Sequence, residues 1–170
     1  MHAYTRGNNR ARIFFDEFDY VEWLRMVARA GEIAEWRCHA YCLMPNHYHL
    51  LVETSQEGLS RAMRHLNGSF AQRINRRYSG TGHVFEGPYR IELIQSQAHL
   101  LEVCRYIPRN PLRASLVGRA DEWRWSSYRP TAGLEHSAPF LTTSFVRSLF
   151  GRGEAALRAY REFVHAGLVS

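Results

Sequence analysis

Residues 33–53 read IAEWRCHAYCLMPNHYHLLVE, and this stretch decides the fold because it holds two β-rich segments on either side of Pro45-Asn46. Aromatic and β-branched residues favour strands, and a short turn between two strands predicts that they pair antiparallel. We therefore expect strands over 33–44 and 48–53. Successive side chains of a strand point to opposite faces, so His47 and His49 are predicted to face the same side.

The segments around this hairpin alternate between strand and helix signals. Residues 3–5 predict a short first strand, followed by a polar turn over 6–10. Asp16 is a suitable N-cap for a helix to about residue 29, whose apolar positions recur every three to four residues and which Gly31 ends. The remaining predicted elements are a helix over 59–77, a strand over 89–95 and a helix over 99–109 that Asn110-Pro111 ends.

The resulting order, β-α-β-β-α-β-α, belongs to the α+β class and is close to the ferredoxin-like arrangement. In that arrangement two helices cover one face of an antiparallel sheet, and the other face is left for a ligand. We expect residues 1–118 to form this main domain and residues 119–170 to form a C-terminal helical extension packed on it. The extension is predicted to hold a Trp-rich clamp over 123–128, a loop over 130–139 and helices around 144–150 and 154–165.

The composition indicates one folded domain with an excess of positive charge. Of the 170 residues 45% are hydrophobic and 22% charged, which excludes disorder as the main state. The chain has neither an apolar run of the roughly 18 residues that a membrane span needs nor a signal-peptide core, so we expect a cytoplasmic protein without a membrane partner.

The positive charge comes from arginine alone. All 22 basic residues are Arg, set against 16 acidic residues, for a net charge of +6. Because the guanidinium fork suits phosphate, nucleic acid is the leading partner class, and an anionic membrane surface is the weaker one. A GC-rich genome would account for the absence of Lys equally well, but it leaves the sign of the net charge unexplained.

Two pairs of side chains are candidates for chemistry. His47 and His49, two residues apart on one strand face, can offer imidazole nitrogens to one divalent metal ion. Tyr106 and Asn110 lie four residues apart, so a phenol and an amide share one helix face. Taken alone, the first pair also fits two partly exposed strand histidines, and the second fits a packed tyrosine with a helix-ending asparagine.

The three cysteines, Cys38, Cys42 and Cys104, are too few for a disulfide framework and fit a reducing compartment. They are expected to be small core residues. A zinc site of Cys38 and Cys42 with the two histidines is the alternative, although the spacing matches no common zinc finger.

Four motifs in a fixed order carry a resemblance to a known family. They are Arg6-Gly7-Asn8-Asn9-Arg10, Pro45-Asn46-His47-Tyr48-His49-Leu50-Leu51-Val52, Tyr106-Ile107-x-x-Asn110-Pro111 and Trp123-Arg124-Trp125-Ser126-Ser127-Tyr128. Together they resemble the REP-associated tyrosine transposases, which are single-tyrosine transposases of the HUH endonuclease superfamily. The resemblance implies a ferredoxin-like HUH domain that cleaves and rejoins single-stranded DNA at hairpin-forming palindromic repeats, acting as a monomer or a homodimer.

The resemblance also implies roles for individual residues. Tyr106 matches the nucleophile that forms a 5′-phosphotyrosine, His47 and His49 match the paired metal-binding histidines, and Asn110 matches the polar residue that helps hold the metal. The implied ion is Mg²⁺ or Mn²⁺. For DNA binding we expect the early polar loop and a set of guanidinium groups interleaved with rings. These residues are Arg6, Asn8, Asn9, Arg10, Arg73, Arg76, Arg77, Tyr78, His83, Phe85, Tyr89 and Arg90.

Two features depart from the family pattern. The first strand is shorter than in most members, which would weaken an edge strand. Pro108 lies between Tyr106 and Asn110, and a kink at this proline would move Asn110 away from the metal.

The residues leave alternatives open. Tyr78 and Tyr128 are rival nucleophiles that lack a polar partner placed like Asn110. The alternative functions are a non-catalytic regulator that binds hairpin DNA and a metal-dependent protein that binds or processes RNA.

Overall fold

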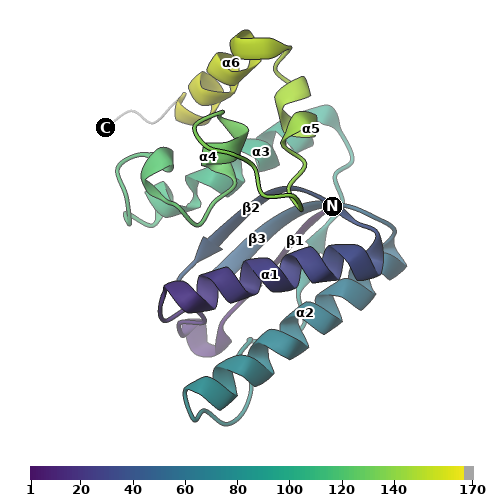
Figure 1. The fold of residues 1–170 in the computed structure, drawn as a ribbon, viewed down its shortest axis with the longest axis vertical. Helices are drawn as coiled ribbons and strands as arrows, with labels where there is room; N and C mark the ends of the chain where they lie inside the picture. Colours follow the sequence, from purple (N-terminus) through teal and green to yellow (C-terminus); the bar gives the residue numbers. More distant parts are fainter. Residues whose placement is uncertain (167–170) are drawn as a thin grey trace.

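The structure is a computed structural model that describes residues 1–166. Its centre is an antiparallel sheet of β1 (His2–Arg6), β2 (Arg37–Met44), β3 (His47–Glu53) and β4 (Arg90–Glu92), in the order β2-β3-β1-β4 (Figure 1). β2 and β3 form the predicted hairpin, and β1 pairs with both β3 and β4. The predicted α+β, ferredoxin-like class is therefore confirmed.

Two long helices, α1 (Glu17–Ala34) and α2 (Gln56–Arg77), cover one face of the sheet (Figure 1). Asp16 caps α1 by accepting a hydrogen bond from the Asp19 amide, and Ser55 caps α2 in the same way from the Gly58 amide. Their apolar stripes bury against the strand residues that point toward them, which form the larger of two hydrophobic cores. The largest side chains of this core include Trp23, Tyr48 and Phe70.

The sequence predicts that the opposite face of the sheet is left for a ligand, but in the structure this face is not free. It carries α3 (Gln97–Arg113), and the C-terminal extension adds a 3-10 turn (Ala120–Glu122), α4 (Tyr128–Thr131), α5 (Thr143–Ser148) and α6 (Gly153–His165) (Figure 1). The reason is the apolar character of this face, where Ala40, Cys42 and Leu51 bury against Val103 and Ile107 in a second core.

The Trp-rich segment lies along the free edge of β2. The Leu43 amide donates to the Trp125 carbonyl (2.8 Å), and the Trp123 indole N–H donates to the Leu43 carbonyl (2.9 Å). Ser127 binds Tyr41 through its backbone amide and through its hydroxyl, whose oxygen accepts from the Tyr41 amide (2.9 Å). The segment thus closes a sheet edge that would otherwise expose unpaired backbone groups.

The first helix is longer than the sequence predicted, and the strand after it starts later. α1 continues through Gly31 to Ala34, and its C-cap residue Glu35 adopts a left-handed conformation (φ 51°). Residues 33–36 are therefore not part of β2. A Cβ on Gly31 would lie 2.6 Å from the indole nitrogen of Trp36. The glycine therefore makes room for a core side chain instead of ending the helix, at a propensity cost of about 1 kcal/mol.

The third helix also continues past its predicted end. α3 includes Pro108, Asn110 and Pro111, which the sequence had placed at or beyond its last turn. Pro111 has no N–H to donate to the Ile107 carbonyl, and the side-chain amide of Asn110 donates to that carbonyl instead (3.3 Å). Two smaller differences are that β4 is shorter than the predicted strand and that α2 begins at Gln56. Within the described residues, no helix is long and apolar enough to cross a membrane.

Candidate active site

Strand alternation gathers the candidate site on the α3 face of the sheet. Tyr4 of β1 is the register partner of His49 on β3, and Arg6 is the partner of His47. Because paired residues in antiparallel strands point to the same face, these four side chains form adjacent columns. His2 and Glu92 are partners one step further along the same face.

The two predicted histidines lie with their rings perpendicular and their centroids 5.2 Å apart. Nδ1 of His47 is 2.7 Å from the side-chain oxygen of Asn46. Nδ1 of His49 is 2.9 Å from Nε2 of His2, whereas Nε2 of His49 is buried and has no hydrogen-bond partner among the described residues. A buried polar atom without a partner is unusual, and this nitrogen is available to bind a ligand.

Tyr106 projects from α3 onto this histidine pair. Its ring stands edge-on to His49, with the centroids 5.2 Å apart and the planes at 88°. The Arg113 guanidinium lies over the Tyr106 ring, 5.1 Å from its centroid. A pocket of roughly 410 Å³ opens beside this tyrosine, and its lining residues are His2, Tyr4, His49, Glu92, His99, Glu102, Val103 and Tyr106.

Asn110 stays close to the histidines in spite of Pro108. Its side-chain nitrogen donates to the carbonyls of Tyr106 (3.0 Å) and Ile107 (3.3 Å), so the amide is held against its own helix. Both donors are thereby used, and the free group is the amide oxygen. The Asn110 side chain lies close enough to His47 to oppose the lowering of that histidine's pKa. The helix therefore does not kink Asn110 away from the site.

Burial keeps both histidines neutral near pH 7. It lowers the pKa of His47 to about 4, with the nearby positive charge of Arg6 acting in the same direction. The pKa of His49 lies well below its usual value of 6.5, first because of burial and then because of His2, His47, Arg6 and Arg113. A neutral imidazole has a lone pair available for a metal, which a protonated ring lacks.

The donor set fits a partial metal site. The unpartnered Nε2 of His49, the ring of His47 and the oxygen of Asn110 all belong to the same corner of the sheet face. Among residues 1–166, no group of three or more His, Cys, Asp or Glu side chains is arranged to hold a metal ion. An ion here would therefore depend on two imidazoles and an amide, with oxygen ligands from water or substrate phosphate completing its coordination.

The structure separates the expected DNA-binding residues into a group beside the histidines, a group paired with acidic side chains, and a remainder. The first group lies beside the histidines. Arg6 ends β1, and Asn8, Asn9 and Arg10 form the exposed 3-10 turn η1 (Asn8–Arg10), whose Arg10 carbonyl accepts a hydrogen bond from the Asn46 side-chain amide (3.1 Å). Arg90 is the register partner of Tyr4 and points to the same face.

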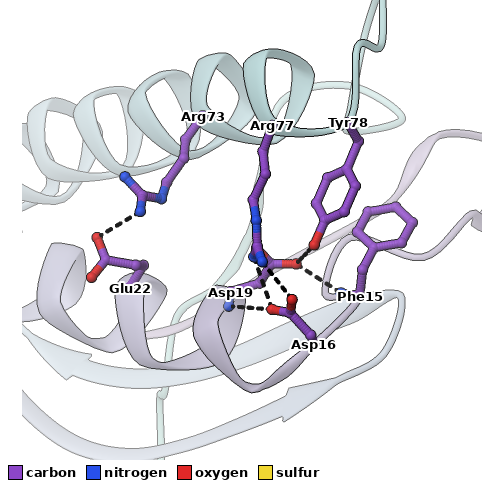
Figure 2. Close-up of polar contacts among 7 residues, drawn as sticks. All are labelled: Phe15, Asp16, Asp19, Glu22, Arg73, Arg77 and Tyr78. Atoms are coloured by element: carbon purple, nitrogen blue, oxygen red, sulfur yellow. Dashed lines mark hydrogen bonds and ion pairs between the residues drawn. The ribbon is translucent and has the colours of Figure 1, made fainter.

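The side chains of the second group bind acidic residues in another part of the fold. Arg77 donates to the carboxylates of Asp16 (2.8 Å) and Asp19 (2.6 Å), and the Tyr78 hydroxyl also donates to Asp19 (2.8 Å) (Figure 2). Arg73 pairs with Glu22 on α1 at 3.3 Å (Figure 2). These side chains join α2 to α1 on the face away from the histidines, so their expected phosphate contacts compete with acidic partners in the fold.

The remaining expected residues also fall outside the histidine site. Phe85 is only 9% exposed and packs with the core rings of Phe70 and Tyr48, so its ring is not free to stack on a base. The Tyr89 hydroxyl donates to Ser60. His83 lines a separate pocket between α2 and the loop after it, together with Asn8 and other residues, and Arg76 is exposed on α2.

The rival nucleophiles are not near this site, and the zinc alternative is not assembled. Tyr128 is buried in the second core, where its hydroxyl lies 3.1 Å from His165. Tyr78 lies on the α1–α2 face. Cys38 and Cys42 are buried in different cores, and burial raises the pKa of the Cys38 thiol to about 12, so the structure does not assemble the zinc site.

Four side chains of the site escaped the sequence analysis. His2 and Tyr4 carry a signal that was available, since they alternate with Arg6 on the first strand in the same way as the two histidines do on theirs. Arg113 is two helical turns after Tyr106, on the same helix face. Glu92 carried no local signal, because only the pairing of β4 with β1 brings it to His2.

A ferredoxin-like antiparallel sheet thus carries paired histidines on one face, and α3 packs a tyrosine against them. The profile of the family described as "Transposase IS200 like" matches residues 1–110, so the chain belongs to this family of transposases.

Among solved structures, the chain is similar to one described as a REP-associated tyrosine transposase bound to a REP hairpin, with a TM-score of 0.64 and 16% identity over 83% of this chain and 86% of that chain. The predicted resemblance is thus confirmed at the level of family and fold. The comparison with curated proteins found no match.

Proposed function

We propose that this transposase cleaves and rejoins single-stranded DNA at hairpin-forming palindromic repeats, with Tyr106 as the nucleophile. The observation that carries the proposal is the packing of the Tyr106 ring against His49, whose buried Nε2 has no partner. The expected substrate rests on the family and on the similar structure, which was solved with a REP hairpin.

The reaction follows from the chemistry of a tyrosine hydroxyl. The Tyr106 oxygen attacks the scissile phosphorus, a new O–P bond forms, and the bond from phosphorus to the 3′-oxygen breaks. The phenol proton leaves Tyr106, and the departing 3′-oxygen takes up a proton to become a free hydroxyl. The 5′ end stays on the enzyme as a phosphotyrosine. Attack by a second 3′-hydroxyl reverses these steps, so rejoining needs no nucleotide cofactor.

His47, His49 and Asn110 are the residues that would hold a divalent cation, Mg²⁺ or Mn²⁺. When bound, such an ion polarises a phosphate and stabilises the negative charge that develops during transfer. The neutral state of both imidazoles at pH 7 favours this role. Imidazole nitrogen is a poorer ligand for Mg²⁺ than oxygen is, so we expect Mn²⁺ to bind more tightly than Mg²⁺.

Arginines near His47 and His49 provide the positive charge that favours binding of a phosphate. The positive charges of Arg6 and Arg113 both act on His49, and Arg113 also lies over the Tyr106 ring. We assign phosphate positioning to these two residues and DNA backbone contacts to the adjacent η1 turn and Arg90.

The test is a covalent-adduct assay. The protein is mixed with Mn²⁺ and single-stranded hairpin oligonucleotides that carry a label at the 5′ or 3′ end, and products are separated in SDS. We expect a metal-dependent adduct that carries the downstream fragment, absent from Tyr106→Phe and retained by Tyr78→Phe and Tyr128→Phe.

Three results would contradict the proposal. An adduct that persists in Tyr106→Phe assigns the nucleophile to another tyrosine. Tight hairpin binding without an adduct under any divalent metal favours the non-catalytic DNA-binding regulator. Preferential binding or cleavage of the same hairpin made of RNA favours the RNA-processing alternative.

A further inference from the structure

A buried histidine that the reaction does not use connects His49 to a carboxylate. His2 lies on β1, with only 4% of its side chain exposed, and stacks on His49 with the ring centroids 5.1 Å apart. Nε2 of His2 is 2.9 Å from Nδ1 of His49, and Nδ1 of His2 is 3.1 Å from the carboxylate of Glu92 on β4. Glu92 also accepts a hydrogen bond from the Tyr4 hydroxyl.

The donor and acceptor roles along this chain have one consistent assignment. An ionised carboxylate only accepts hydrogen bonds, so Nδ1 of His2 must carry the proton that it donates to Glu92. A neutral imidazole has one N–H, which leaves Nε2 of His2 as an acceptor. Nδ1 of His49 must therefore be the donor in the bond between the two rings. Nε2 of His49 is then left with a lone pair, and this is the buried atom that lacks a partner.

We propose that Glu92, acting through His2, holds His49 in the tautomer that directs the Nε2 lone pair toward the metal position. The inference rests on the proposed function for the identity of the ligand. Both Glu92 and His2 are positioning residues, since the role proposed for them acts through His49. Metal-binding histidines commonly donate their second nitrogen to a fixed acceptor, and loss of that acceptor typically weakens metal binding by about 10–100-fold. In this chain the acceptor is a second histidine.

The sheet contains a matched pair for control experiments. His39 and Glu53 are 3.0 Å apart, and their side chains are 4% and 58% exposed, against 4% and 47% for His2 and Glu92. His39 contacts Phe145 and does not reach His47 or His49 through any hydrogen bond among the described residues. Glu53→Gln therefore has the same chemical change and a similar environment, without the connection to the site.

The experiment has two readouts on the intact chain. The first is the protonation of the ring nitrogens in the metal-free protein, measured by ¹⁵N NMR with labelled histidine. We expect wild-type His49 to carry its proton on Nδ1, His2→Leu to lose that preference, and Glu92→Gln to weaken it, because a glutamine side chain can donate to His2 as well as accept from it. The second is Mn²⁺ affinity by calorimetry. We expect about 10–100-fold weaker binding for His2→Leu, a smaller loss for Glu92→Gln and no change for Glu53→Gln.

A conservative variant separates positioning from packing. The side-chain oxygen of a glutamine can accept from the His49 Nδ1–H, so His2→Gln should bind Mn²⁺ more nearly as wild type does than His2→Leu. The proposal is overturned if wild-type His49 carries its proton on Nε2, or if His2→Leu and Glu92→Gln bind Mn²⁺ like wild type. A wild-type protein that shows the expected tautomer and binds no Mn²⁺ would contradict the proposed function and the metal-directed role of Glu92 together, while the hydrogen-bonded chain itself would stand.

Discussion

The ring of Tyr106 packs edge-on against the ring of His49, at 88° and with 5.2 Å between the centroids. The tyrosine comes from α3 and the histidine from β3, so the contact depends on how this helix is seated on the sheet. Removal of the hydroxyl leaves the ring and its packing in place. Tyr106→Phe therefore separates a chemical effect from a structural one, which makes it the most informative single substitution in the molecule.

Removal of His49, a proposed metal ligand, should slow the covalent chemistry without abolishing DNA binding. We expect His49→Ala to slow adduct formation by about 100-fold or more, because it removes several kcal/mol of transition-state stabilisation. His39→Ala also truncates a buried histidine of the sheet and should keep the wild-type adduct rate. Quantified adduct formation and hairpin-binding isotherms check both variants, and an unchanged rate in His49→Ala would rule out its role as a ligand.

The Asp19 carboxylate should contribute strongly to the stability of the α1–α2 layer. It is fully buried and accepts from the Phe15 amide, Arg77 and the Tyr78 hydroxyl (Figure 2). Asp19→Ala leaves these donors without their acceptor, so we expect a loss of about 2–4 kcal/mol in the free energy of unfolding, measured by urea denaturation.

The control for this substitution lies on the same helix. Glu17 pairs with Arg124 in an exposed ion pair, with side chains 72% and 60% exposed. Because exposed ion pairs are worth about 0–1 kcal/mol, Glu17→Ala should change the stability little. Equal losses for the two variants would mean that the buried network does not matter.

Stability should fall as the pH drops below 7. The pKa of His47 is about 4 in the folded protein and about 6.5 in an unfolded chain, and that of His49 is lowered in the same direction. Between these values the unfolded state binds protons that the folded state does not, so acidification favours unfolding. Urea midpoints from pH 7 to pH 4.5 should decrease, and His47→Gln should flatten the profile. A flat wild-type profile would contradict the burial argument.

The Trp-rich segment should stabilise the sheet edge through Ser127. This buried hydroxyl accepts from the Tyr41 amide and donates to the Tyr41 carbonyl. Ser127→Ala leaves the Tyr41 amide without its acceptor, while the Tyr41 carbonyl keeps the Ser127 backbone N–H, and we expect a cost of about 1–3 kcal/mol, equivalent to a Tm decrease of several degrees. Ser148→Ala, which removes an exposed hydroxyl on α5, should change Tm by much less in calorimetry.

Local patterns were sufficient for much of the fold. The hairpin around Pro45-Asn46, the Asp16 cap and the apolar spacing of α2 could all be predicted because each depends on residues within a few positions of one another. The end of α1 could not be predicted, because Gly31 serves the close packing of Trp36 and does not end the helix. The continuation of α3 likewise depends on the Asn110 side chain, which replaces a hydrogen bond that Pro111 cannot make.

The sequence by itself determined that His47 and His49 share one face, since strand alternation is a local property of the backbone. Only the tertiary structure decided which charges and rings meet. It joined Glu92 and His2 to His49 across three strands, and it paired Arg77 with the buried Asp19 and the exposed Asp16. The physical reason is that a hydrogen bond or ion pair depends on positions a few ångströms apart, and strand register and helix packing set those positions for residues far apart in the chain.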